Sequence, residues 1–228
     1  MRTAQCLGLS PALTARFLIV FAMRHIPAAA TQQTQVLSFE EALRPTNQDY
    51  DREAWLYVPD HYSEYRYILG TRGQKPLICI GVNPSTAIPG RLDNTLKSAE
   101  RIALFNGFDS FIMFNVYAQR ATLPEDMDRE WNLSLHAENM KAFRYALEQS
   151  KEAPAIWAAW GAVIEKRAYL PLCVREMIQI GREYGARWYT AGPRSKAGHP
   201  HHPLYLKKDS LLEPFTDLEA YLLSLEKS

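Results

Sequence analysis

Short apolar runs separated by amphipathic stretches dominate the chain from residue 77 onward. Residues 77–82, 111–114, 156–160 and 188–190 are mostly aliphatic or aromatic, as in strands buried on both faces of a parallel sheet. Apolar residues at helical spacing fill 94–104, 133–147 and 163–184; we expect Asn94 to cap the first helix, Gly107 to end it, and Pro171 to kink or split the last. Strands alternating with helices of this length predict a three-layer α/β/α fold around a central, mainly parallel four-stranded sheet.

The flanking segments add smaller elements to this core. Residues 65–69 alternate apolar and polar side chains before a turn with two glycines, which predicts an antiparallel edge strand. Ser38 and Glu41 form a capping box that opens a short helix, which Pro45 stops, and residues 218–222 predict a last packing helix. We expect a poorly ordered extension and linker over residues 1–48 and a single α/β domain over residues 49–228.

The first 30 residues raise the question of targeting. The apolar run 17–23 has seven residues, whereas a membrane-spanning helix needs about 20. Arg2, this run and the small residues 28–30 could form a signal peptide, but the run is short and flanked by arginines. We favour the interpretation that these residues are a loosely ordered extension or result from an over-assigned start site. We expect no membrane anchor.

Composition narrows the class of protein. Hydrophobic residues make up 47% and charged residues 22%, which argues against a disordered or fibrous chain. Lys and Arg total 26 against 25 Asp and Glu, so a net charge of +1 provides no overall attraction to nucleic acid or to an anionic membrane. Three widely spaced cysteines exclude a disulfide framework and a CxxC pair, and a reducing, cytoplasmic setting fits best.

Ligands of open α/β sheets bind outside the carboxyl ends of the strands, so the residues that follow each apolar run are the candidate site. After the first run, Gly81 allows close backbone approach and Pro84 stiffens a loop that also holds Ser85 and Thr86. Asn83 in this loop can orient a water or a hydroxyl but cannot act as a general base. The alternative is a purely structural turn in which Asn83 caps its own backbone.

The second and third runs also end in informative residues. Asn115 follows the second run, and its amide can donate to and accept from a planar, amide-like ligand. Tyr117 offers a stacking face, although packing is the simpler role. Trp160 ends the third run and is expected in the core or the crevice wall.

The fourth run leads into the most basic segment of the chain. Residues 187–208 hold five Lys and Arg, three of the six histidines and no acid. Arg194 or Lys196 would meet a phosphate. His199 and His202 stand in a proline-stiffened loop and could donate to developing negative charge or shuttle protons. Metal binding is less favoured because too few acidic ligands lie nearby, and we expect no metal or cofactor.

Two motifs carry a resemblance to a known family. The segments Gly-Val-Asn-Pro-Ser-Thr-Ala at 81–87 and Gly-His-Pro-His-His-Pro-Leu-Tyr-Leu at 198–206 resemble the bacterial family called domain of unknown function 1643, over roughly residues 65–215. Asp93, Asn115, Arg120 and Trp160 fall between the motifs as in that family, which has no known activity. The resemblance implies the strand order 2-1-3-4.

The order of the motifs is also remotely similar to that of the uracil-DNA glycosylase superfamily. This similarity implies that Asn83 positions the attacking water, Asn115 reads the base edge, and a histidine steadies the departing base anion. The last loop has one residue too many, so either His199 or His202 could be the equivalent histidine. The superfamily's leucine wedge cannot be identified, and three scattered cysteines exclude its iron–sulfur branch. The residues that we expect to bind substrate are Gly81, Pro84, Ser85, Thr86, Asp93, Asn115, Tyr117, Arg120, Arg194 and Lys196.

Two functions follow as hypotheses. The first is a hydrolase that cleaves an N-glycosidic bond in a nucleic acid or a nucleoside-like molecule, with Asn83, His199 and His202 as catalytic candidates. The alternative is a non-catalytic module that binds a nucleotide or single-stranded nucleic acid in the same crevice. A near-zero net charge favours a small ligand over long DNA. A structural or partner-binding protein would leave the polar strand ends unexplained, and the sequence favours no oligomeric state.

Overall fold

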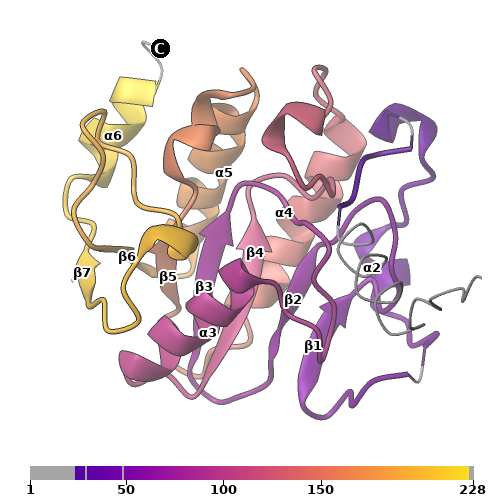
Figure 1. Ribbon diagram of the computed structural model, residues 1–228, viewed down its shortest axis with the longest axis horizontal. Helices are drawn as coiled ribbons and strands as arrows, with labels where there is room; N and C mark the ends of the chain where they lie inside the picture. Colours follow the sequence, from indigo (N-terminus) through magenta and orange to yellow (C-terminus); the bar gives the residue numbers. More distant parts are fainter. Residues whose placement is uncertain (1–23, 29, 48, 226–228) are drawn as a thin grey trace, which may run out of the picture.

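The computed structural model describes residues 24–28, 30–47 and 49–225, and the apolar run 17–23 lies outside the described residues. Figure 1 shows the arrangement of the elements. The strands are β1 (Trp55–Val58), β2 (Ile68–Thr71), β3 (Pro76–Gly81), β4 (Ser110–Asn115), β5 (Ala155–Ala158), β6 (Arg187–Ala191) and β7 (Leu212–Pro214). The α-helices are α2 (Phe39–Ala42), α3 (Asn94–Phe105), α4 (Leu133–Leu147), α5 (Leu170–Glu183) and α6 (Leu218–Leu225). The 3-10 helices are η1 (Thr31–Gln33), η2 (Pro124–Asp126), η3 (Gly161–Glu165) and η4 (Pro203–Tyr205).

The strands form one mixed sheet of seven in the order β1-β2-β4-β3-β5-β6-β7. The prediction of a four-stranded sheet with one added edge strand is therefore wrong in size. The four predicted central strands do run parallel, and their order β4-β3-β5-β6 is the expected 2-1-3-4. β2 is not an edge strand, because it pairs antiparallel with both β1 and β4, and β7 pairs antiparallel with β6 at the other edge.

Helices cover both faces of the sheet, as the alternation along β3 shows. Leu77 and Cys79 face the cluster that includes α3, whereas Ile78 and Ile80 face the cluster built with α4 and α5. This alternation is the period of two that a strand imposes on its side chains. The α/β/α layering expected from the sequence is thus present around the larger sheet (Figure 1).

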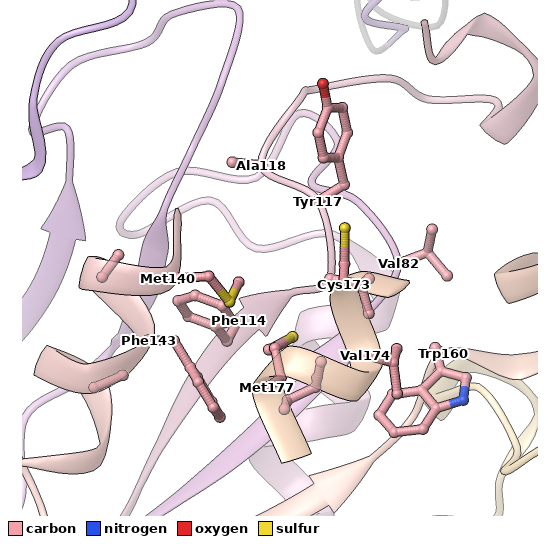
Figure 2. Close-up of a cluster of buried hydrophobic side chains, with 14 of the residues drawn as sticks. Val82, Phe114, Tyr117, Ala118, Met140, Phe143, Trp160, Cys173, Val174 and Met177 are labelled. Atoms are coloured by element: carbon pink, nitrogen blue, oxygen red, sulfur yellow. The ribbon is translucent and has the colours of Figure 1, made fainter. Parts of the chain in front are cut away.

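The core on the face of α4 and α5 is rich in aromatic and sulfur-containing side chains (Figure 2). Phe114 of β4 and Phe143 of α4 lie with ring centroids 5.2 Å apart. Met177 of α5 is fully buried in the same cluster. Trp160, at the end of β5, joins this core and also reaches the candidate site described below.

Helix termini explain where the predicted helices differ from the observed ones. Asp93, not Asn94, caps α3, because its carboxylate accepts a hydrogen bond from the Leu96 N–H at 2.9 Å. The predicted helix 163–184 is split into η3 and α5. Pro171 lies in the first turn of α5, where its missing N–H costs nothing, so the split comes before it and no kink occurs at it.

Packing begins before residue 49. The capping box of Ser38 and Glu41 is present and opens α2, whose Phe39 is buried in the main core. Further upstream, Thr31 is buried and its N–H donates to the Asp128 carboxylate at 2.7 Å. The described part of the N-terminal segment therefore contacts the α/β domain. Within the described ranges, none of the helices combines the length and apolar character that a membrane span requires.

Candidate functional site

A pocket of about 630 Å³ lies at the carboxyl ends of the central parallel strands. Its walls come from the loops after β3, β5 and β6, the end of β4 and the first turn of α3. Nine of the sequence-predicted site residues line it: Gly81, Asn83, Pro84, Ser85, Thr86, Asp93, Asn115, His199 and His202. The topology brings them together because parallel strands end at the same edge of the sheet.

Asn83 is held by its amide nitrogen. Nδ2 donates to the carbonyl of Ala121 at 2.7 Å and to that of Pro84 at 3.1 Å. Only an NH₂ group can donate to two carbonyls, so the orientation of the amide follows from its partners. Asn83 therefore braces its loop and still has Oδ1 as an acceptor at the pocket wall.

Asn115 ends β4 with a side chain that is 1% exposed and lines the pocket. Neither Nδ2 nor Oδ1 has a hydrogen-bond partner among the residues that the structure describes, although buried amides are almost always paired. Gly81 lies close beside it, because a Cβ at Gly81 would lie 3.2 Å from Oδ1 of Asn115 and would also displace Cε of Met113, which would be 2.7 Å away. The floor of the pocket thus presents an unused donor and an unused acceptor from one rigid group.

His199 is buried, and both of its ring nitrogens already have partners. Nδ1 lies 3.1 Å from the Tyr221 hydroxyl and Nε2 lies 3.1 Å from Oε1 of Glu165. The Trp160 indole N–H donates to the same hydroxyl at 2.7 Å, so Tyr221 has its own proton left to donate to Nδ1. This chain of donors assigns the His199 proton to Nε2, facing Glu165.

His202 is half-buried and has a free ring nitrogen. Its Nδ1 accepts from the Leu204 N–H at 3.4 Å, which leaves the proton of the neutral ring on Nε2. Burial lowers the pKa of His202 below its usual 6.5, while the nearby carboxylate of Asp93 acts in the opposite direction. At neutral pH His202 is therefore an uncharged donor in the pocket wall.

Arg66 is a pocket residue that the sequence reasoning missed. It is 1% exposed, and its Nη1 donates to the Ala87 carbonyl at 3.2 Å, while Nε and Nη2 have no partner. Burial lowers its pKa to about 9, with the neighbouring Arg120 charge acting in the same direction, so Arg66 is still protonated at pH 7. The residue lies in an alternating segment where a polar side chain would be expected to face solvent.

Arg120 lies behind the pocket and is absent from its lining. Its guanidinium is buried, donates to the Ser85 carbonyl and to the Tyr57 hydroxyl, and lies 4.3 Å from the centre of the Tyr62 ring. Burial lowers its pKa also. Arg120 thus holds the loop that contains Ser85 and adds a second positive charge near Arg66.

Besides Arg120, three further predicted binding residues lie away from the pocket lining. Tyr117 is buried against Tyr169, with ring centroids 4.9 Å apart, which is the packing role considered for it. Arg194 forms an ion pair with Asp217 at 2.6 Å. Lys196 is exposed in the loop between β6 and His199. Among the residues that the structure describes, no three His, Cys, Asp or Glu side chains gather so as to hold a metal ion.

The fold and pocket define an α/β protein whose candidate site lies at the carboxyl edge of a mixed sheet. The chain belongs to the family described as protein of unknown function (DUF1643), whose model matches residues 66–204. This range contains both motifs that carry the resemblance, apart from the last residues of the second, and every candidate residue that lines the pocket. No curated protein matches the chain.

Proposed function

We propose that this protein is a hydrolase that cleaves the N-glycosidic bond of a small nucleoside-like molecule. The observation that carries the proposal is the unpaired, fully buried amide of Asn115 in the pocket. The remote similarity to the uracil-DNA glycosylase superfamily supports it through the order of the motifs.

Asn115 is suited to recognise a heterocyclic base. An amide offers a donor and an acceptor side by side, which matches the edge of a base with a carbonyl next to an N–H. Asn115 is buried and its backbone carbonyl accepts from Nδ2 of Asn139 at 3.0 Å, so the backbone that carries the amide is fixed before any ligand arrives. A ligand that pairs with it removes the cost of two unsatisfied polar atoms.

Asn83 and His202 are the residues that would carry the chemistry. Oδ1 of Asn83 would accept a hydrogen bond from a water and so orient it, and the water oxygen attacks the anomeric carbon as the carbon–nitrogen bond breaks. The departing nitrogen keeps the bonding electron pair, and Nε2–H of His202 donates a hydrogen bond to the resulting negative charge. After the attack, the water oxygen loses a proton, which passes to the departing nitrogen, so the base leaves as a neutral molecule and no strong general base is required.

His202 fits the donor role better than His199. Both ring nitrogens of His199 are engaged by Tyr221 and Glu165, whereas Nε2 of His202 is free. The extra residue in the loop therefore moves the donor role from the first histidine to the third. His199 becomes a positioning residue that fixes the loop carrying His202.

The size of the pocket favours a small molecule over a duplex. About 630 Å³ lies within the range of small-ligand sites, and the net charge of +1 provides no general attraction to a polymer.

One observation favours the non-catalytic alternative. Asp93 is the only carboxylate among the described lining residues, and it already caps α3. A pocket without a free base could bind the same nucleoside-like ligand without cleaving it.

The test is a panel of purine and pyrimidine nucleosides and their 5′-monophosphates, with release of free base followed by chromatography and binding followed by calorimetry. We expect Asn83→Ala and His202→Ala to abolish release and Asn115→Ala mainly to weaken binding. Arg194→Ala, which changes a residue outside the lining, is the control and should behave as the parent. Binding without release would support the alternative, and neither binding nor release would refute both.

A further inference from the structure

Arg66 carries a buried positive charge that forms no ion pair within the described part of the chain. Two of its three guanidinium nitrogens have no partner, and within the described part of the chain no carboxylate forms an ion pair with it or with Arg120. A buried, unpaired charge is unfavourable unless something else pairs with it. Since Arg66 lines the pocket, a ligand can reach it.

The charges around this side of the pocket are unbalanced. The charge of Arg120 is close enough to lower the pKa of Arg66, whereas Asp93, the only carboxylate among the described lining residues, acts in the opposite direction. One oxygen of Asp93 is used by the Leu96 N–H. The positive charges of Arg66 and Arg120 therefore lie near a single carboxylate, Asp93, one oxygen of which is already hydrogen-bonded.

The first turn of α3 contributes donors to the same pocket. Asn94, Thr95 and Leu96 all line it. The backbone N–H groups at the start of this 12-residue helix have no intrahelical acceptors, and Asp93 satisfies only that of Leu96 among these three. The positive end of the helix dipole adds to the attraction for an anion.

We infer that the pocket contains a phosphate subsite, formed by Arg66 and the first turn of α3, so that its ligand is a nucleoside-like molecule bearing a phosphate monoester. The nucleoside part rests on the proposed function, whereas the phosphate subsite rests on Arg66 and α3 alone.

The geometry of the donors favours phosphate over a carboxylate. Nε and Nη2 of Arg66 form one edge of the planar guanidinium and can donate side by side to two oxygens. The N–H groups and the Thr95 hydroxyl at the start of α3 would address the remaining oxygen. A carboxylate has no third oxygen to meet these donors.

The subsite is tested by measuring the binding of three probes: a nucleoside, its 5′-monophosphate, and inorganic phosphate alone. Calorimetry gives the affinities for the parent, for Arg66→Met, and for the control Arg194→Met, which removes an arginine outside the pocket. We expect the parent to bind the monophosphate at least about tenfold more tightly than the nucleoside, a difference that Arg66→Met removes and Arg194→Met retains.

Inorganic phosphate separates the two proposals. If it raises the melting temperature of the parent but not of Arg66→Met, the subsite is supported even when no nucleoside binds, and only the proposed base recognition fails. Equal affinity of the parent for nucleoside and monophosphate would overturn the subsite, as would a preference for the monophosphate that persists in Arg66→Met. Should Arg66→Met fail to fold, the comparison of nucleoside with monophosphate in the parent decides the question without a variant.

Discussion

The hydroxyl of Tyr221 lies 3.1 Å from Nδ1 of His199, although the two residues come from different parts of the fold. Tyr221 belongs to α6, and His199 stands in the loop after β6. The hydroxyl also accepts from the Trp160 indole, so one oxygen joins the end of β5, the histidine loop and α6. His199 is thereby a buried structural centre of the site, with both of its ring nitrogens engaged.

Removing this hydroxyl should destabilise the fold. Tyr221→Phe leaves the Trp160 N–H and Nδ1 of His199 without their partner, and we expect the free energy of unfolding to fall by about 1 to 3 kcal/mol. Urea denaturation measures the change. Tyr205→Phe is the matched control, because Tyr205 is 78% exposed and water replaces any bond that its hydroxyl makes. Equal stability of the two variants would contradict the role of Tyr221.

Asn115 should matter for the ligand and not for the fold. Asn115→Ala removes two unsatisfied polar atoms, so we expect thermal stability to be unchanged or slightly higher, while ligand affinity falls by about 1 to 3 kcal/mol. The comparison is Asn139→Ala, another buried asparagine, whose Nδ2 donates to the carbonyls of Asn115 and Val116. That variant should unfold at a lower temperature. A marked loss of stability in Asn115→Ala would show that its amide is paired within the protein.

His202 should make stability depend on pH below about 6.5. Because burial lowers its pKa in the folded state, the unfolded chain binds the proton more readily, and acidification through the window between its unfolded and folded pKa favours unfolding. We expect His202→Gln to lose less stability than the parent between pH 7.5 and pH 5.5. Urea denaturation at intermediate pH values gives the two slopes. Other groups titrate equally in both proteins, so parallel slopes would refute the assignment.

The segment upstream of residue 36 should contribute measurably to stability. Deleting residues 1–35 removes the bonds of Thr31 to Asp128 and of the His25 N–H to Thr122 at 2.7 Å, together with the contact of His25 and Glu64 at 3.1 Å. We expect the melting temperature to fall by more than about 5 °C, since roughly 1 to 2 kcal/mol corresponds to that shift in a domain of this size. A variant that begins at Arg24 keeps these contacts and is the control. Identical melting temperatures for the two truncated variants would show that the contacts of Thr31 and His25 do not stabilise the protein.

Local patterns were sufficient to predict the central elements. The helix expected over residues 133–147 is α4 (Leu133–Leu147), and β3 and β4 lie within one residue of their predicted starts. The two strands are apolar runs buried on both faces of the sheet, and α4 has the helical spacing of a helix packed on one face. β1 and β7 were not predicted, although β1 (Trp55–Val58) is a short run of four apolar residues. β7 has three residues and is mostly exposed, so it carries no apolar pattern of its own. Pairing with β6, not the sequence, makes β7 a strand.

The site residues that directly follow a strand could be predicted from the sequence. The site residues whose burial or hydrogen bonds depend on residues far along the chain could not. Asn83, Asn115 and the histidine loop could be placed because residues that follow parallel strands meet at one edge. Arg66 precedes β2 in a segment whose alternation indicated an exposed polar residue, and its burial depends on the loop after β3, which lies 21 residues away at Ala87. The occupation of both His199 nitrogens depends on Glu165 and Tyr221, which no local pattern indicates.

The Tyr221 hydroxyl that contacts His199 also has a consequence for the order in which the site assembles. Tyr221 follows His199 by 22 residues, and α6 supplies none of the residues that line the pocket. During synthesis, the described residues that line the pocket therefore leave the ribosome before α6, and His199 gains its Tyr221 partner only after α6 docks. In the folded protein, the contact between His199 and Tyr221 should also transmit an effect of the ligand to α6. A ligand that holds the histidine loop should slow hydrogen exchange in α6, although α6 does not line the pocket.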